Sequence, residues 1–147
     1  MAGEHLEARA RRVLVGLDES GRSAIVSDTP AEARLATQAF TPSVDVADDG
    51  TIAITYYDFS ADTVASPTLD TQYWVTKSTD GGLTWSAREE ITNGPFDMRS
   101  APFANGFFTG DYEGLESAGS TFLPLVSLAN TGNAANPTDT FSARVTP

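Results

Sequence analysis

The sequence contains no cysteine and a single histidine, and these absences exclude several kinds of site. Without cysteine, neither a disulfide nor a cysteine-bound zinc site can form. His5 lies near the N-terminus, where we expect it to be solvated, and we expect neither a metal nor a cofactor. No apolar run approaches the roughly 20 residues that a membrane-spanning helix needs. Acidic residues in the segment 1–7 stand where a secretory signal peptide would be basic, so the chain as written is expected in the cytoplasm.

Basic residues are also scarce. The 147 residues include 9 Lys and Arg against 20 Asp and Glu, which gives a formal net charge of -11. Most of this excess lies after residue 40. Such an acidic surface repels nucleic acid and anionic lipid, so we expect neither a nucleic acid nor a membrane as partner.

The sequence is rich in β-strand signals from residue 43 onward. Four segments rich in β-branched and aromatic residues predict antiparallel strands, with a hairpin turn at 48–50 between the first two. Asp58 and Asp70 flank the loop between the second and third strands, and we expect them to cap it or to be solvated. A change in composition near Pro42 predicts a domain boundary there. The four expected strands are 43–47, 51–58, 72–77 and 85–91.

A second, incomplete series of strands follows. We expect strands at 110–115, 121–128 and 140–145, with no fourth strand. Pro124 lies inside the second of these and predicts an edge strand or a bulge, because proline cannot donate to a β-ladder.

The first forty residues have a different pattern. It predicts a short charged helix at 4–12, two strands at 12–17 and 22–28, and a helical turn at 30–35. Whether this hairpin arm supplies the missing strand of the second series is left open.

The run Ser78–Trp85 fits the pattern Ser-x-Asp-x-Gly-x-Thr-Trp at every specified position. Asp80 can accept hydrogen bonds from backbone N–H groups two residues on, and the two glycines that follow it tolerate positive φ. We expect Thr84 to begin the returning strand and Trp85 to wedge under the hairpin with its N–H bonded. The run is therefore expected to be a structural turn without chemistry of its own.

This motif is the Asp-box, or BNR repeat, and the chain from Pro42 onward resembles the last blades of bacterial sialidases, which are β-propellers. The resemblance implies an all-β fold of antiparallel four-stranded blade-like sheets, about one and three-quarter blades, plus an N-terminal hairpin arm. Members of this family are often secreted. The segments that carry the resemblance are 44–50, 78–85, 95–102 and 106–115, and the structural positions of the Asp-box are Ser78, Asp80, Gly82, Thr84 and Trp85.

Residues 1–41 instead resemble the leading edge of a small cupin, on segments 11–23 and 26–28. The cupin metal motif needs clustered histidines, which this chain lacks, so the resemblance carries no metal site. We therefore expect a fusion in which a cupin-like arm, residues 1–41, precedes a sialidase-like fragment, residues 42–147.

The resemblance to sialidases implies a particular chemistry. In that family a tyrosine activated by a glutamate attacks the sugar, an aspartate acts as acid and base, and three arginines bind the substrate carboxylate. The implied catalytic residues are Tyr112, Asp111 and Glu113, and Arg99 is the implied carboxylate ligand. The glutamate expected after the tyrosine and the arginines of earlier blades are missing. A tyrosine packed in the core and an arginine in a surface ion pair are the alternative interpretations.

Three functions remain open from the sequence. The chain is a sialidase-like glycoside hydrolase relative with an incomplete active site, a non-catalytic module that binds a glycan or a protein, or a non-functional fusion product. Open sheet edges would allow self-association. A two-sheet sandwich or a closed oligomeric barrel would favour the binding module, and aggregation would favour the fusion product. Tyr56, Tyr73 and Trp74 could stack on sugar, but their spacing on strands favours the core.

Overall fold

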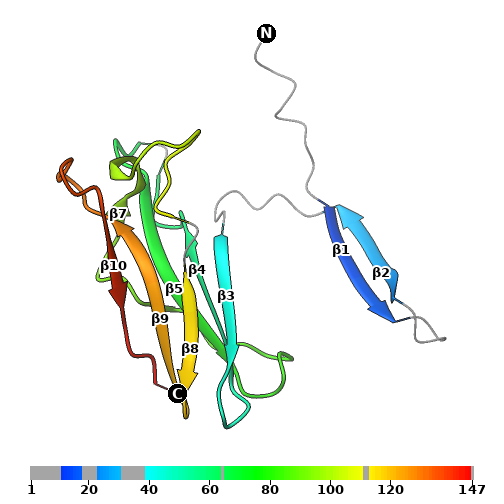
Figure 1. Cartoon of the computed structure of the whole chain (residues 1–147). Helices are drawn as coiled ribbons and strands as arrows, with labels where there is room; N and C mark the ends of the chain where they lie inside the picture. The colour runs from blue at the N-terminus through cyan, green and yellow to red at the C-terminus, as the bar shows by residue number, and fades with distance from the viewer. Residues whose placement is uncertain (1–10, 18–22, 31–38, 64, 111–112, 147) are drawn as a thin grey trace. The chain divides into compact units, whose positions relative to one another are not determined.

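The computed structural model describes residues 11–17, 23–30, 39–63, 65–110 and 113–146, and it is all-β with antiparallel pairing (Figure 1). The chain divides into two compact units, Met1–Leu35 and Ala36–Pro147. Within the described ranges, no helix is long and apolar enough to cross a membrane.

The first unit contains one antiparallel pair of strands, β1 (Arg11–Leu17) and β2 (Ser23–Pro30). Their register shifts between Leu14 and Val15. The two expected strands are thus confirmed. The expected helix over 4–12 is wrong at its end, because the extended backbone of β1 already begins at Arg11. The rest of that helix, the connection between the two strands and residues 31–35 of the expected helical turn lie outside the described residues, as does His5.

The second unit begins with a sheet in the order β3–β4–β5–β6. Its main strands are β3 (Phe40–Val46), β4 (Ile52–Asp58) and β5 (Asp70–Ser78), which confirm the first three expected strands. A short strand, β7 (Phe96–Asp97), also pairs with β5 and leads into the 3-10 helix η2 (Met98–Ser100).

Pro42 lies inside β3 rather than at the start of a new element. The register of β3 against β4 is irregular between Phe40 and Ser43, and Thr41 has a φ of 42°. The irregularity accommodates the proline, because β3 is the outermost strand in the order β3–β4–β5–β6 and pairs only with β4 in that sheet. The change in composition therefore does not coincide with the start of the strand.

The expected fourth strand over 85–91 is wrong in its length, because β6 contains only Glu89–Glu90. Near the start of the expected strand, hydrogen bonds between Ser86 and Lys77 replace the regular β-ladder. The Ser86 hydroxyl accepts a hydrogen bond from Lys77 N at 3.0 Å, and its own N–H donates to Lys77 O at 2.8 Å. The segment before β6 is therefore held against β5 by one side-chain and one backbone hydrogen bond.

The second sheet has the order β10–β9–β8, with β8 (Gly114–Ala118), β9 (Thr121–Ala129) and β10 (Thr138–Ser142). The strand expected from residue 110 begins only at Gly114. Pro124 was expected on an edge or at a bulge, but β9 is the central strand. The carbonyl of Pro124 faces Ala143, just beyond the end of β10, and accepts from its N–H at 3.4 Å. Because N and C=O of one strand residue point to the same side, the missing proline N–H falls in the gap between the end of β10 and the bridge that Phe122 forms with Val145.

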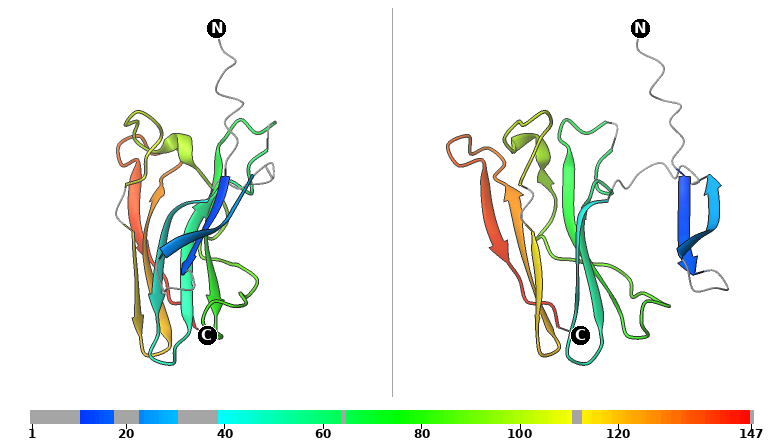
Figure 2. Two further views of the ribbon diagram at one scale, coloured as in Figure 1. Left: turned by 90° about the vertical axis from the view of Figure 1, so that its right-hand side faces the viewer. Right: turned by 45° about the vertical axis from the view of Figure 1, so that its right-hand side comes forward.

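The two sheets of the second unit face each other and bury their core between them (Figure 2). One cluster gathers around Tyr57 and Tyr73, and the other around Phe122 and Val75. Strands β3 and β8 lie side by side (Figure 1), and the turns that follow them are joined by a hydrogen bond from Asp48 N to Gly119 O at 3.1 Å.

The Asp-box run forms the expected turn, and both glycines after Asp80 have positive φ. Asp80 accepts from the N–H and the hydroxyl of Thr84, at 2.9 and 2.5 Å, so its backbone partner lies four residues on instead of two. These hydrogen bonds, together with one from Ser78, lower the pKa of Asp80 to about 2. Trp85 was expected under the hairpin, but 41% of its surface remains exposed, and Thr84 lies in the loop instead of a strand.

Candidate functional site

Glu113 is the one of the three implied catalytic residues that the structure describes. It immediately precedes β8, and its carboxylate lies against residues of the other sheet. Thr41 Oγ1 on β3 donates to one carboxylate oxygen at 2.7 Å, and the Tyr73 hydroxyl on β5 donates to the other at 3.4 Å. Glu113 thus lies between the two sheets, with hydroxyl groups on both of its oxygens.

Two buried tyrosines form the floor of this site. Tyr57 on β4 and Tyr73 on β5 are register partners, which places them on the same inward face, and their ring centroids are 4.6 Å apart. The Tyr57 hydroxyl donates to Ser127 O at 2.5 Å, while the Tyr73 hydroxyl also lies 2.8 Å from Thr55 Oγ1. Burial, with the nearby Glu113 carboxylate, raises the pKa of both phenols well above the usual value. Both tyrosines are therefore neutral hydrogen-bond donors rather than phenolate nucleophiles.

Burial also governs the protonation of Glu113. It disfavours the carboxylate and raises the pKa to about 7, although hydrogen bonds from Thr41 and Tyr73 act in the opposite direction. A carboxyl group with this pKa holds a proton in part of the molecules at neutral pH and can either donate or accept one. The site therefore contains a group suited to general acid or base catalysis.

This raised pKa makes stability depend on pH. The folded chain retains the proton between pH 4.5 and about 7, where the unfolded chain has lost it, so the stabilisation is complete below pH 4.5 and disappears as pH rises through about 7. We expect the free energy of unfolding to fall by about 1–2 kcal/mol over this range, allowing for solvent screening. Glu113→Gln should remove this part of the pH dependence in urea titrations.

Glu116→Gln is the matched control, because Glu116 lies on β8, the strand that follows Glu113, with an exposed side chain. It should keep the pH profile of the native chain. An unchanged profile in the Glu113 variant would show that its carboxyl titrates normally.

Of the other candidates from the sequence, the structure describes only Arg99, and its contacts lie elsewhere than Glu113. Asp111 and Tyr112 lie outside the described residues. Arg99 is exposed on η2, where its guanidinium donates to the carbonyl of Pro67 and its N–H to Asp97. Among the described residues, the side-chain partner of Arg99 is the neutral carbonyl of Pro67, and the alternative interpretation of a surface ion pair stays a prediction.

The expectation that Asp58 is a cap or a solvated residue is half correct. It caps the loop by accepting from Ser60 N at 3.0 Å, but only 1% of its surface is exposed. The Trp74 indole N–H donates to it at 2.8 Å, and Arg88 pairs with it while stacking 3.9 Å from the Trp74 ring centroid. Burial raises the pKa of Asp58, but the Ser60 and Trp74 hydrogen bonds and the Arg88 charge outweigh it, so the pKa lies below its usual range.

Sequence reasoning missed Thr41 as a partner of Glu113, Arg88 as a partner of Asp58, and Tyr57 as the ring that packs on Tyr73. The signal available for the tyrosines was the alternation along β4 and β5, which places Tyr57 and Tyr73 on one face. Tyr73 is in the core as expected, whereas Tyr56 and Trp74 lie on the opposite, half-exposed face. No local pattern indicated that Arg88 would reach a residue thirty positions earlier.

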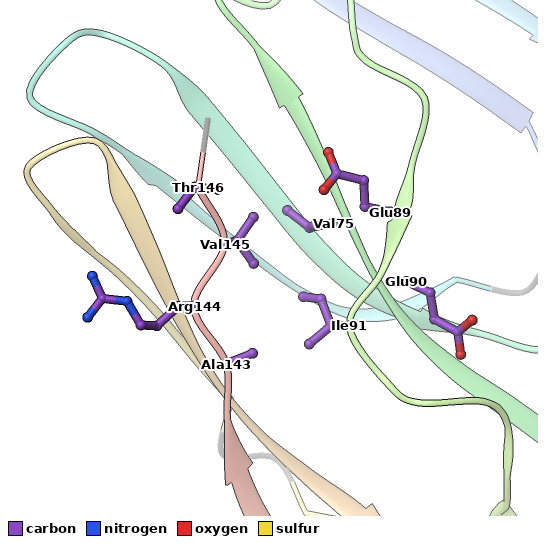
Figure 3. A pocket seen from close by; sticks show the side chains of 8 residues that line it. All are labelled: Val75, Glu89, Glu90, Ile91, Ala143, Arg144, Val145 and Thr146. Atoms are coloured by element: carbon purple, nitrogen blue, oxygen red, sulfur yellow. The ribbon is translucent and has the colours of Figure 1, made fainter.

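A cavity of about 220 Å³ lies between β6 and the C-terminal segment (Figure 3). Val75, Ile91 and Val145 point into it, whereas Glu90 and Arg144 point away. Because two of the three charged residues that line the cavity point away from it, we assign no site there.

Within the part of the chain that the structure describes, no three His, Asp or Glu side chains are grouped as a metal site would require. Comparisons of the sequence and the structure with protein-family models, curated proteins and solved structures found no match.

Proposed function

We propose that this chain belongs to a sialidase-like glycoside hydrolase, in which Glu113 exchanges the proton that glycosidic bond cleavage requires. The observation that carries the proposal is the Glu113 carboxyl group, partly buried, bonded by Thr41 and Tyr73, and with its pKa raised to about 7. Glycosidases commonly need a carboxyl group with such a raised pKa to protonate the leaving oxygen.

Two features of the fold support the same proposal. The sheet β3–β4–β5–β6 is an antiparallel meander with the Asp-box turn between its third and fourth strands. Its first strand, β3, lies beside β8, the first strand of the second meander. Neighbouring blades of a propeller have this arrangement, in which the first strands gather around a common axis.

The test is turnover of a fluorogenic 4-methylumbelliferyl sialoside by the purified chain. Glu113→Gln keeps the shape of the side chain and one of its two acceptor atoms but cannot exchange a proton, so kcat/KM should fall by about 100-fold or more. Glu116→Gln should leave turnover unchanged, since Glu116 is exposed on β8, the strand that follows Glu113. Tyr112→Phe examines the tyrosine nucleophile that the sialidase resemblance implies. Equal turnover by the native chain and Glu113→Gln, or no turnover by a folded native chain, would contradict the proposal.

The second candidate is a non-catalytic module that binds a glycan. The face-to-face packing of the two sheets favours it, because such a sandwich buries a complete core without further sheets. Calorimetric binding of a sialoside without turnover, weakened by Glu113→Gln, would favour this candidate over the hydrolase.

A further inference from the structure

The segment Pro102–Phe108, here called the Phe loop, displays three phenylalanines to solvent. Phe103, Phe107 and Phe108 are 74%, 43% and 39% exposed. Single exposed apolar residues are common, but three aromatic rings on one short loop form an apolar patch. Such patches often mark a site that binds a ligand or a partner.

The Phe loop is held in shape by its own contacts. Phe103 and Phe107 form an antiparallel bridge, and their rings meet edge to face with centroids 5.7 Å apart. Phe108 N donates to Pro102 O at 3.0 Å and closes the loop, and Asn105 turns it with a φ of 59°. Because these bonds fix the backbone, the positions from which the rings project are set before any ligand arrives, which lowers the entropic cost of binding.

The Phe loop also leads directly into the Glu113 site. The next residue, Thr109, interacts through its side chain with the hydroxyl of Tyr57, the ring that packs on Tyr73. The loop and the starts of β3 and β8 lie at the same end of the unit (Figure 1). A ligand whose polar part is held at Glu113 could therefore extend an apolar part over these rings.

We propose that the Phe loop binds the apolar aglycone, an aryl or alkyl group, of a glycoside whose sugar lies at Glu113. This inference rests on the proposed function. The loop sequence Pro-Phe-Ala-Asn-Gly-Phe-Phe contains no charged side chain, so the matching ligand group is neutral and apolar. A membrane surface is a poorer match, since the net charge of -11 opposes approach to anionic lipid.

The experiment compares binding of octyl and methyl thiosialosides, which resist hydrolysis, to the whole native chain by calorimetry. We expect the octyl compound to bind at least about 10-fold more tightly, because part of its chain is buried against the rings. The variant Phe103→Ser/Phe107→Ser should reduce this ratio to about 1, while Phe103→Tyr/Phe107→Tyr keeps it. Leu83→Ser, a change at a residue that is 85% exposed on the Asp-box loop, should also keep it.

The outcomes separate this inference from the proposed function. If octyl thioglucoside is preferred over methyl thioglucoside in the same loop-dependent way, and the sialosides bind no more tightly than the glucosides, the Phe loop binds the apolar group but the site is not specific for sialosides. The inference would then hold and the proposed function would fail. An octyl preference that persists in the folded serine variant, or no preference in the native chain, would overturn the inference. Loop-dependent sedimentation with phosphatidylcholine vesicles would overturn it as well, because the loop would then be a membrane contact.

Discussion

Replacing Phe122 with alanine is expected to lower the free energy of unfolding by about 3–5 kcal/mol. Phe122 is fully buried at the centre of the cluster that joins Ala53 and Val75 of one sheet to Val145 of the C-terminal segment. Its backbone also exchanges two hydrogen bonds with Val145, each of 2.9 Å, so the surrounding chain is fixed and cannot collapse into the space left by the ring.

Urea unfolding followed by circular dichroism measures this loss. Phe141→Ala is the matched control, because Phe141 is 46% exposed on β10, and its loss should be about 1 kcal/mol or less. Similar losses in the two variants would mean that the two sheets do not share a packed core at Phe122.

Replacing Asp58 with alanine is expected to cost about 3 kcal/mol, the second largest effect. The change would remove the buried carboxylate that accepts from the Trp74 N–H and the Ser60 N–H and that pairs with the partly exposed Arg88 guanidinium. Asp58→Asn should cost less, since the amide oxygen still accepts from Trp74 or Ser60 although the charge is lost.

A double-mutant cycle with Arg88→Ala isolates the ion pair. The Asp58 and Arg88 changes should be non-additive by about 1 kcal/mol or more, because each removes the same contact. Asp48→Ala is the control for loss of an acid, as Asp48 is exposed in the first hairpin turn. Additive effects of the Asp58 and Arg88 variants would show that the pair contributes nothing measurable.

The strands and tight turns could be predicted from the sequence, because their signals are local. Alternation along β4 and β5 reflects a two-residue period, and the Asp-box turn depends on residues within four positions of Asp80. Predictions failed where a distant partner decided the outcome. Pro124 is tolerated in a central strand where regular pairing with β10 is interrupted, before it resumes between Phe122 and Val145. The fourth strand is short where hydrogen bonds of Ser86 replace the regular ladder.

The sequence by itself determined an acidic, cysteine-free, all-β chain with an Asp-box turn, since composition, alternation and glycine positions act over a few residues. It also singled out Glu113, but not its environment. Only the tertiary structure decided that Thr41, 72 residues away, and Tyr73, 40 residues away, would contact its carboxylate. Burial and the hydrogen bonds of a titrating group are set by whichever strands fold against it, and that pairing is not encoded in any single segment.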